Sequence, residues 1–261
     1  MKTTPYRLAF LADIHANLHA LEAVLAAIHR DAPDLVVVGG DLTYRFPFPR
    51  ETLELLATVE HRAIAGNTER YVTRWAAPGA WPDFLPAHGA AHAAWTRERI
   101  GDAWADYLAA LPPDLALSVA GEDDMLVVHG VPGNPFVGIH APPGPENRHP
   151  DWAMPDDVLA GHLAGVHARL ILAGHTHIPL VRRWGDSLIV NPGAVGYTWP
   201  TVPDPHLARY ALLTHRPSRG WEVALRAVPY DTAAAIRALR ETDAGNARAG
   251  RFIALLGGPG G

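Results

Sequence analysis

An apolar run near the start of the chain, residues 8–12, leads directly into Asp13 and His15. An uninterrupted apolar run of this length is typical of a parallel strand that is buried on both faces. Ligands of open α/β sheets bind beyond the carboxyl ends of such strands, and both polar side chains can bind a metal ion. An Asp-x-His pair alone is more often a satisfied hydrogen bond than a site. A metal site therefore requires matching side chains at other strand ends.

The following segments alternate between helical and strand patterns. A helical pattern over 17–29, with Asn17 as its expected N-cap, precedes the apolar run 35–38, a helical pattern over 51–59 and a short strand over 61–65. This alternation predicts a parallel sheet with crossover helices. Further strands are expected over 115–119, 125–128, 170–173, 180–184, 188–190, 209–213 and 221–228, and further helices over 156–167 and 231–240.

Two stretches interrupt this pattern. Residues 68–112 are rich in Trp and Tyr and predict two or three helices that cover one side of the sheet as a cap. Their aromatic side chains are expected mainly in a core under the cap, with a substrate pocket as the alternative. Residues 131–155 are rich in Pro, Gly and Asn, and a loop of this length is usually functional or mobile. We therefore expect a single domain over 1–261 with a helical cap over 68–112 and an active-site loop over 131–155.

Composition excludes several classes of function. A chain of 261 residues with 48% hydrophobic residues resembles an ordinary globular protein, and its net charge of -5 gives no sign of a nucleic-acid surface. There is no cysteine, which excludes disulfides and thiolate metal sites. The N-terminal residues lack the apolar core of a signal peptide, and no apolar stretch is long enough to cross a bilayer. We expect a cytoplasmic protein without a membrane partner.

Oxygen and nitrogen ligands follow five of the predicted strands. They are Asp13 with His15, Gly40-Asp41, Gly66-Asn67, His129-Gly130 and Gly174-His175-Thr176-His177. Each of these side chains alone would more often be a cap or a hydrogen-bond partner in the core. Five such strand ends in one chain favour a shared site, and the neighbouring glycines allow sharp turns and close backbone approach.

The order and spacing of these residues resemble the calcineurin-like metallophosphoesterase superfamily. Its motifs DxH, GDx, GN, a lone His and GHxH all occur here, in this order, within residues 8–200. The GNT sequence at 66–68 and the segment Asn191-Pro192-Gly193-Ala194 resemble the small bacterial and archaeal phosphodiesterase branch. The resemblance implies an α/β fold, a four-layer α/β/β/α sandwich with a dimetal site at the carboxyl ends of the strands.

The resemblance also implies the metal ligands. One ion would be held by Asp13, His15, Asp41 and His177, and the other by Asp41, Asn67, His129 and His175. Asp41 would bridge the ions, since a carboxylate has two oxygens with several lone pairs, and Asp41, Asn67 and His129 would act directly in catalysis. Two ions roughly 3.5–4 Å apart can clamp the oxygens of an in-line displacement at phosphorus and convert a shared water to hydroxide. The donor set suits Mn, Fe, Zn or Ni, and we expect Mn.

The chain departs from the family pattern at Thr68. Many members have a histidine at this position, thought to interact with the leaving group, whereas a threonine cannot act as a general acid near neutral pH. Losing such an acid typically costs on the order of 10²–10⁴ in rate, unless His140 or His19 supplies the proton; surface or structural roles are more common for both. Arg70 and Tyr71 could contact a phosphoryl oxygen or a base, and a surface salt bridge and a core aromatic are equally good interpretations.

These observations predict a dinuclear metal-dependent phosphohydrolase and favour a phosphodiesterase over a phosphomonoesterase. The expected substrate is a small phosphoester such as a nucleotide. A phosphomonoesterase or protein phosphatase of the same superfamily is the alternative. A non-catalytic scaffold of the same fold would lack some of the ligands, all of which are present here. A metal-dependent amidohydrolase would carry His-x-His on its first strand, where this chain has Asp13-Ile14-His15.

Overall fold

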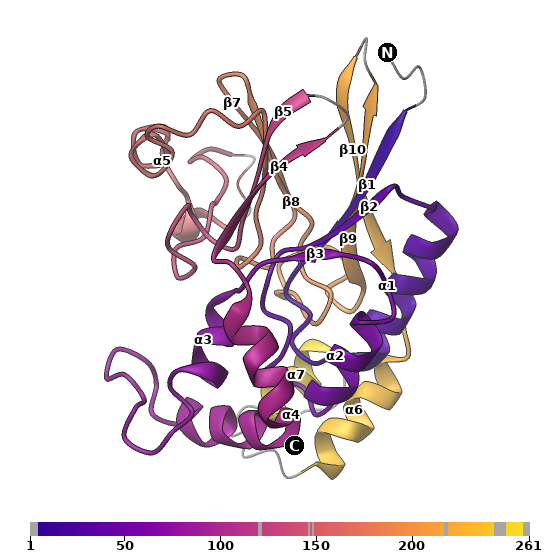
Figure 1. Ribbon diagram of the computed structural model, residues 1–261, viewed down its shortest axis with the longest axis vertical. Coiled ribbons are helices and arrows are strands. Elements are labelled where there is room, and N and C mark those ends of the chain that lie inside the picture. Colours follow the sequence, from indigo (N-terminus) through magenta and orange to yellow (C-terminus); the bar gives the residue numbers. More distant parts are fainter. Residues whose placement is uncertain are drawn as a thin grey trace.

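Two five-stranded sheets lie face to face at the centre of the computed structural model, which describes residues 5–119, 122–145, 147, 149–216, 219–242 and 249–257 (Figure 1). The first, sheet A, has the strand order β10-β9-β1-β2-β3. Its strands are β1 (Tyr6–Leu11), β2 (Leu35–Val38), β3 (Arg62–Ala63), β9 (Ala208–Arg216) and β10 (Gly220–Val228). As predicted, β1, β2 and β3 are parallel, but β9 pairs antiparallel with both β1 and β10. Sheet A is therefore mixed, and its three parallel strands end at the same edge.

The second sheet, sheet B, is mixed in the same way, with the order β4-β5-β6-β8-β7. Its strands are β4 (Asp114–Val119), β5 (Glu122–Val128), β6 (Leu170–Leu172), β7 (Leu180–Trp184) and β8 (Ser187–Asn191). The inner strands β5, β6 and β8 are parallel, whereas β4 and β7 run antiparallel to their neighbours. His129 and Gly174 follow β5 and β6 and thus lie at one edge of sheet B.

The apolar run of β1 is buried on both faces. Leu8 and Phe10 belong to the core between the sheets, where they join Met125, Val127, Leu170, Leu172 and Val190 of sheet B. Ala9 and Leu11 face the other way, into a second core against the helices. Successive side chains of a strand point to opposite faces, so a strand between two apolar layers has no position for a polar residue until its end.

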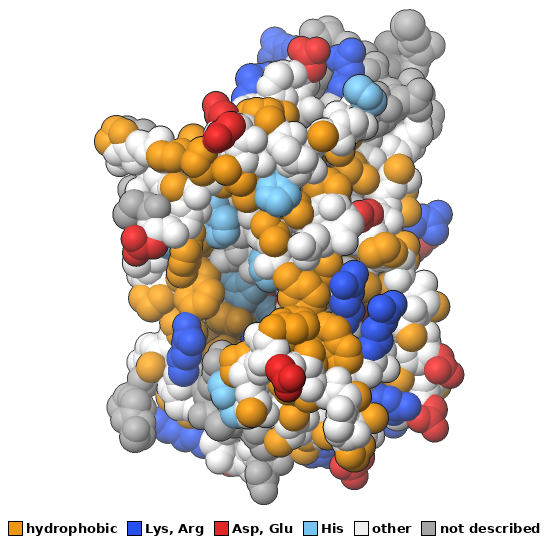
Figure 2. All heavy atoms as spheres, turned by 90° about the vertical axis from the view of Figure 1, so that its left-hand side faces the viewer, with side chains coloured by type: hydrophobic (Ala, Val, Ile, Leu, Met, Phe, Trp, Pro, Cys, Tyr) orange, Lys and Arg blue, Asp and Glu red, His pale blue; other side chains and the backbone are white. Residues whose placement is uncertain are grey.

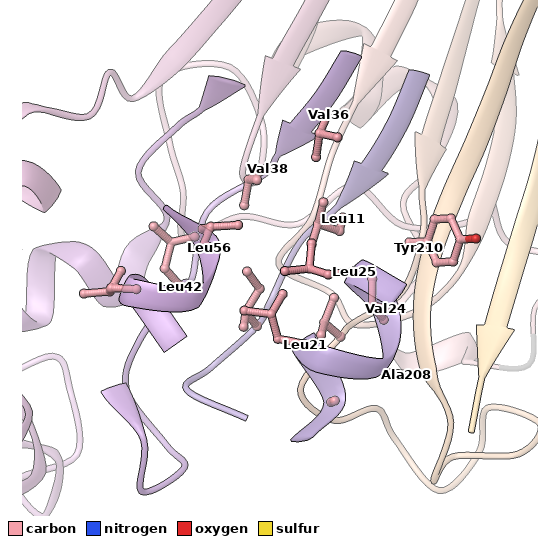
Figure 3. Close-up of a cluster of buried hydrophobic side chains, with 14 of the residues drawn as sticks. Leu11, Leu21, Val24, Leu25, Val36, Val38, Leu42, Leu56, Ala208 and Tyr210 are labelled. Carbon is pink, nitrogen blue, oxygen red and sulfur yellow. The ribbon is translucent and has the colours of Figure 1, made fainter. Parts of the chain in front are cut away.

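Helices cover the outer face of each sheet and complete the predicted α/β/β/α sandwich. On sheet A, the helices α1 (Leu18–Asp31) and α2 (Pro49–Leu56) bury side chains such as Leu21, Leu25 and Leu56 against Leu11 and Val38 (Figure 3). On sheet B, Leu159 of α5 (Asp156–His162) packs in a core with Ile139 and Met154 of the long loop. The outer face of sheet B is thus covered more by this loop than by a helix.

The cap and the chain end supply the remaining helices. The cap contains α3 (Asn67–Thr73) and α4 (Gly89–Ala110), and α4 is interrupted by the left-handed backbone of Gly101. The helices α6 (Thr232–Glu241) and α7 (Ala249–Leu255) pack around Phe46 and Tyr197. Figure 1 shows both groups of helices below the sheets, close to where the strands end. The division into one domain with a cap stays a prediction.

Three segments differ from the expected boundaries. The helix α5 ends at His162 rather than at 167, and Gly165 beyond it adopts a left-handed backbone; a left-handed glycine just past a helix is a common helix stop. The strand β3 has two residues instead of five. The long loop 131–155 contains a single short 3₁₀ helix, η1 (Pro150–Trp152), among its described residues.

The buried Arg182 of β7 fixes this loop against sheet B. Its guanidinium donates hydrogen bonds to the carbonyl oxygens of His140 (2.6 Å) and Met154 (3.1 Å) and to the carboxylate of Asp156 (2.5 Å). A charged donor that is shared among loop acceptors can order a segment that has no regular secondary structure. Within the described part of the chain, no helix is long and apolar enough to cross a membrane.

Replacing Asn17 tests how the start of α1 is held in place. Its side chain accepts from the Ala20 N–H (3.2 Å) and donates to the carbonyl of Gly196 (2.7 Å), and it is buried. We expect Asn17→Ala to lower the free energy of unfolding by about 2–4 kcal/mol, because it removes a cap and leaves a buried carbonyl unpaired. Urea denaturation measures this. The side chain of the exposed cap Asp231 accepts from the Ala234 N–H (2.8 Å), and Asp231→Ala should cost about 1 kcal/mol. Equal losses in the two variants would contradict this role of Asn17.

Candidate metal centre

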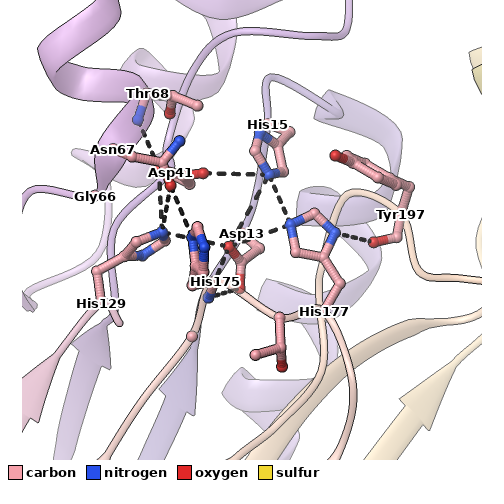
Figure 4. Close-up of polar contacts among 12 residues, drawn as sticks. Asp13, His15, Asp41, Gly66, Asn67, Thr68, His129, His175, His177 and Tyr197 are labelled. Atoms are coloured by element: carbon pink, nitrogen blue, oxygen red, sulfur yellow. Dashed lines mark hydrogen bonds and ion pairs between the residues drawn. The ribbon is translucent and has the colours of Figure 1, made fainter. Parts of the chain in front are cut away.

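Side chains from both sheets converge where the parallel strands end (Figure 4). The structure brings together all of the residues that the strand-end pattern singled out: Asp13, His15, Asp41, Asn67, His129, His175 and His177. Asp13 and His15 follow β1, Asp41 follows β2, Asn67 begins α3 just beyond β3, and the other histidines follow β5 and β6. Two separate sheets thus contribute to one cluster.

The backbone at these positions is strained. Asp13, His15, Asp41, His175 and His177 all have positive φ angles, between 54° and 68°. Residues with a Cβ rarely adopt this left-handed conformation, and such strain is concentrated at functional sites. The strand-end loops also hold one another, since the Asp13 N–H donates to the Gly40 carbonyl (3.0 Å) and the His15 N–H to the Asp41 carbonyl (2.9 Å).

Gly66 is required for the same close approach. A Cβ atom at this position would overlap the carboxylate of Asp41 and lie 2.9 Å from the His129 ring. The loop after β3 can therefore reach the loop after β2 only with a glycine here.

Three of the histidines are oriented by backbone carbonyls. The Nδ1 atoms of His15, His129 and His177 lie 3.0, 2.8 and 2.8 Å from the carbonyl oxygens of Tyr44, Gly39 and Tyr197. A carbonyl can only accept, so each Nδ1 carries the hydrogen, and in its neutral form each ring turns the lone pair of Nε2 toward the centre. This arrangement is typical of metal-binding histidines.

The Nε2 atoms of His15 and His177 are only 3.0 Å apart. With Nδ1 protonated on both rings, two lone pairs face each other, and a proton or a metal ion between them relieves the repulsion. Asp13 Oδ1 lies 3.4 Å from His177 Nε2 and 4.0 Å from His15 Nε2. Asp13, His15 and His177 thus form one group of atoms that could hold a metal ion.

Asp41 lies between this group and the second one. Its Oδ2 is 3.5 Å from His15 Nε2, and its Oδ1 is 3.4 Å from His129 Nε2. Beyond it, Asn67 Oδ1 lies 3.1 Å from His129 Nε2 and 2.9 Å from His175 Nδ1. The two carboxylate oxygens of Asp41 therefore face different histidines. Asp13 also approaches His129 and joins it and Asp41 in a second group that could hold an ion.

Burial sets the charge of the cluster. Asp13 is fully buried, yet the nearby His177, His129 and His15 outweigh the burial and hold its pKa at about 2. Burial raises the pKa of Asp41, and it lowers the pKa of His175 to about 3 with help from His129. Carboxylate, imidazole and amide oxygen are ligands that suit a divalent transition-metal ion. The donor set therefore fits a divalent metal ion.

A cavity of about 240 Å³ opens above the cluster, and Figure 2 shows a hollow with histidine side chains inside it. Besides the candidate ligands, it is lined by Arg45, Tyr71, Tyr197, Trp199, Arg251 and Phe252. Arg45 packs on the Tyr44 ring (4.7 Å) and Arg251 on the Trp199 ring (5.2 Å). Two guanidinium groups beside the cluster can bind phosphoryl oxygens.

The residues proposed for substrate contact lie in different places in the structure, and not all of them line this cavity. Tyr71 lines the cavity, and burial together with Asp41 raises its pKa to about 12. The buried Thr68 turns its hydroxyl to the Thr43 carbonyl (3.3 Å) and donates its N–H to Asp41 Oδ1 (2.8 Å). Arg70 packs on the Phe136 ring.

Neither candidate proton donor lines this cavity. His140 lies in a neighbouring cavity, and His19 packs on Phe48 beside Glu22. Of the five residues considered from sequence for substrate contact or proton transfer, Tyr71 alone lines the cavity above the cluster.

Glu69 holds the loops around Asp41 and was not singled out from sequence. Its carboxylate accepts from the N–H groups of Asp41 (2.9 Å), Leu42 (2.9 Å) and Gly66 (2.7 Å). Burial and the charge of Asp41 raise its pKa to about 7, although the N–H donors favour the ionised form. The available signal was a glutamate three residues after an N-cap, the pattern of a capping box.

Replacing Glu69 tests whether this support matters for the site. In Glu69→Gln, the new NH₂ group meets backbone N–H donors, so the loop that carries Asp41 should shift. We expect a 10- to 100-fold loss of metal affinity or activity, roughly as for other residues that orient metal ligands. Metal titration of the purified variant measures it, with the exposed Glu60→Gln as the control. Wild-type affinity in both variants would contradict the role.

Comparison with known proteins agrees with this geometry. Residues 6–179 match the family model of the calcineurin-like phosphoesterases. An uncharacterized protein of Methanocaldococcus jannaschii is 27% identical over 188 residues, which cover 72% of this chain and 69% of that protein. A metallophosphoesterase from Sphaerobacter thermophilus superposes with a TM-score of 0.71 at 24% identity, covering 97% of this chain and 99% of its own. A hypothetical protein from Pyrococcus horikoshii OT3 has a TM-score of 0.71 at 23% identity, with 94% and 97% covered. The chain belongs to the calcineurin-like phosphoesterase family and is a metal-dependent phosphoester hydrolase.

Proposed function

We propose that the protein hydrolyses small phosphodiesters with two divalent metal ions bound at the strand ends. The observation that carries the proposal is the position of Asp41, whose two carboxylate oxygens face His15 on one side and His129 on the other. Asp13, His15, Asp41 and His177 would hold one ion, and Asp41, Asn67, His129 and His175 the other. Bound ions would supply a hydroxide nucleophile at neutral pH and neutralise charge on the phosphoryl oxygens.

The side chains around the ions would bind and orient the substrate. Arg45 and Arg251 line the cavity from opposite ends of the sequence, and their guanidinium groups can bind phosphoryl oxygens in a bidentate manner. The phenol of Tyr71 stays protonated at neutral pH because its pKa is about 12, so it can donate a hydrogen bond to the same oxygens.

Two observations support a diester rather than a monoester. The hydroxyl of Thr68 turns to the Thr43 carbonyl, and neither candidate proton donor from the sequence lines the cavity above the cluster. A substrate whose leaving group needs little protonation suits such a site. A second cavity beside the cluster also offers room for a second substituent on phosphorus. A phosphomonoesterase or a protein phosphatase is the alternative, while manganese and a cytoplasmic location stay predictions from the sequence.

The substrate preference can be measured directly. With added Mn²⁺, we expect bis-p-nitrophenyl phosphate to be hydrolysed with a higher kcat/KM than p-nitrophenyl phosphate. Both esters release p-nitrophenolate, which departs without a general acid, so they differ in the second substituent on phosphorus, for which the cavity beside the cluster has room. Asp41→Ala should abolish the activity, and Asp83→Ala, at an exposed position of the cap, should leave it unchanged. A clear preference for the monoester would overturn the proposal of a diesterase. Inactivity toward both esters with Mn²⁺, Fe²⁺, Zn²⁺ and Ni²⁺ would favour a scaffold of the same fold.

A further inference from the structure

We propose that a second cavity, beside the metal centre, binds a planar heteroaromatic ring of the substrate, the size of a purine base. This inference rests on the proposed function, because the ring would belong to a substituent of the phosphodiester. The cavity has a volume of about 450 Å³, which lies within the usual range for small-molecule sites. It lies between the loop that carries His140 to Trp152 and the segments around Thr176 and Thr201.

The second cavity and the metal centre share a wall. Thr176, which lines the second cavity, stands in the chain between the candidate ligands His175 and His177. Trp199 lines the cavity above the metal centre, and its Nε1 donates to the Thr176 carbonyl (2.8 Å). The other side of Trp199 meets Trp152 of the second cavity, with ring centroids 5.3 Å apart. The two cavities are therefore immediate neighbours, and the proposal places one substituent of the bound phosphoester in the second.

The walls suit a flat aromatic ring. His149 and Trp152 are stacked with their centroids 5.3 Å apart and their planes only 5° from parallel. Trp152 keeps 40% of its surface exposed, so it can present a ring face to a ligand. Ile178, Pro179 and Val202 supply apolar surface to the same cavity. Aromatic platforms of this kind bind nucleobases by stacking, with little dependence on the hydrogen bonds of the base.

Polar side chains make up a minority of the residues that line the cavity. Asn147 and the hydroxyl of Thr201 line the cavity, and Thr201 lies 3.2 Å from His149 Nδ1. Arg209 also lines it, but its guanidinium already donates to the carbonyl oxygens of Pro203 and Asp204. The side-chain amide of Asn147 likewise already donates to the Pro142 carbonyl (3.2 Å) and accepts from the His149 N–H (2.8 Å). We therefore assign the polar contact of the ring to the hydroxyl of Thr201. An apolar cavity with a few polar groups is the usual composition of a small-molecule site.

Hydrogen bonds within the protein hold the loop that forms the cavity. Arg182 donates to the carbonyls of His140 and Met154, which flank the cavity-lining part of the loop, and to Asp156 beyond it. Less conformational entropy is then lost on binding, which favours affinity.

Binding of a nucleoside without phosphate tests the cavity independently of catalysis. Adenosine and ribose are titrated by calorimetry into the full-length protein and into Trp152→Ala and Trp152→Leu, the latter keeping an apolar side chain if alanine impairs folding. We expect adenosine to bind the wild type at least about fivefold more tightly than either variant, in line with the contribution of one stacked base, and ribose not to bind. Phe84→Ala removes an exposed aromatic of the cap and should bind as the wild type does.

Equal adenosine affinities in the wild type and both Trp152 variants, or no binding to the wild type, would overturn the inference. Hydrolysis then separates it from the proposed function. The p-nitrophenyl ester of adenosine 5′-monophosphate and that of ribose 5-phosphate differ only in whether the base is present, and both release p-nitrophenolate, which departs without a general acid. Trp152→Ala should lower kcat/KM at least about fivefold for the first ester only. Adenosine binding that depends on Trp152, with no diester hydrolysed, supports the cavity and removes the proposed diesterase. Equal hydrolysis of both esters by wild type and variant supports the diesterase and removes the cavity.

Discussion

The burial of two carboxylates in a cluster of histidines is the constraint on which the rest of the structure depends. Asp13 and Asp41 are 0% and 2% exposed, and a buried charge is costly unless it is paired or binds a metal. Three of the surrounding imidazoles turn an Nε2 lone pair inward because backbone carbonyls hold their Nδ1–H groups. The nearby histidines compensate the charge of Asp13 in part, and divalent cations would compensate both carboxylates.

The fold provides this cluster by joining the ends of two sheets. Each sheet contributes parallel strands whose carboxyl ends meet at one place, and the core between the sheets keeps those strands apolar up to their last residues. The strained backbone at five candidate ligands, the overlap that any side chain at Gly66 would cause, and the hydrogen bonds of Glu69 hold the strand-end loops together. The protein's own contacts therefore hold the geometry of the site.

Local signals in the sequence were enough to predict the parallel strands β1 to β3 and the polar strand ends, whereas the sandwich was implied by the family resemblance. The run of β1, the N-cap Asn17 and the positions of Asp41 and Asn67 after short strands depend on neighbouring residues, so they could be interpreted without a structure. Arg45, Arg251 and Trp199 could not be found in this way, because chain folding over long sequence distances brings them to the cavity. The antiparallel pairing that makes sheet A mixed could not be predicted for the same reason, since β9 pairs with β1 from about 200 residues away along the chain. The early end of α5 depended on the left-handed backbone of Gly165, which a helical pattern does not reveal.

The metal content of the purified protein tests the central claim most directly. After loading with Mn²⁺ and desalting, elemental analysis of the wild type should find two ions per chain. Asp41→Asn should retain fewer than one, because both proposed ions share this carboxylate, whereas Asp83→Asn should retain two. One ion or none in the wild type, or two ions in Asp41→Asn, would contradict a dinuclear centre bridged by Asp41.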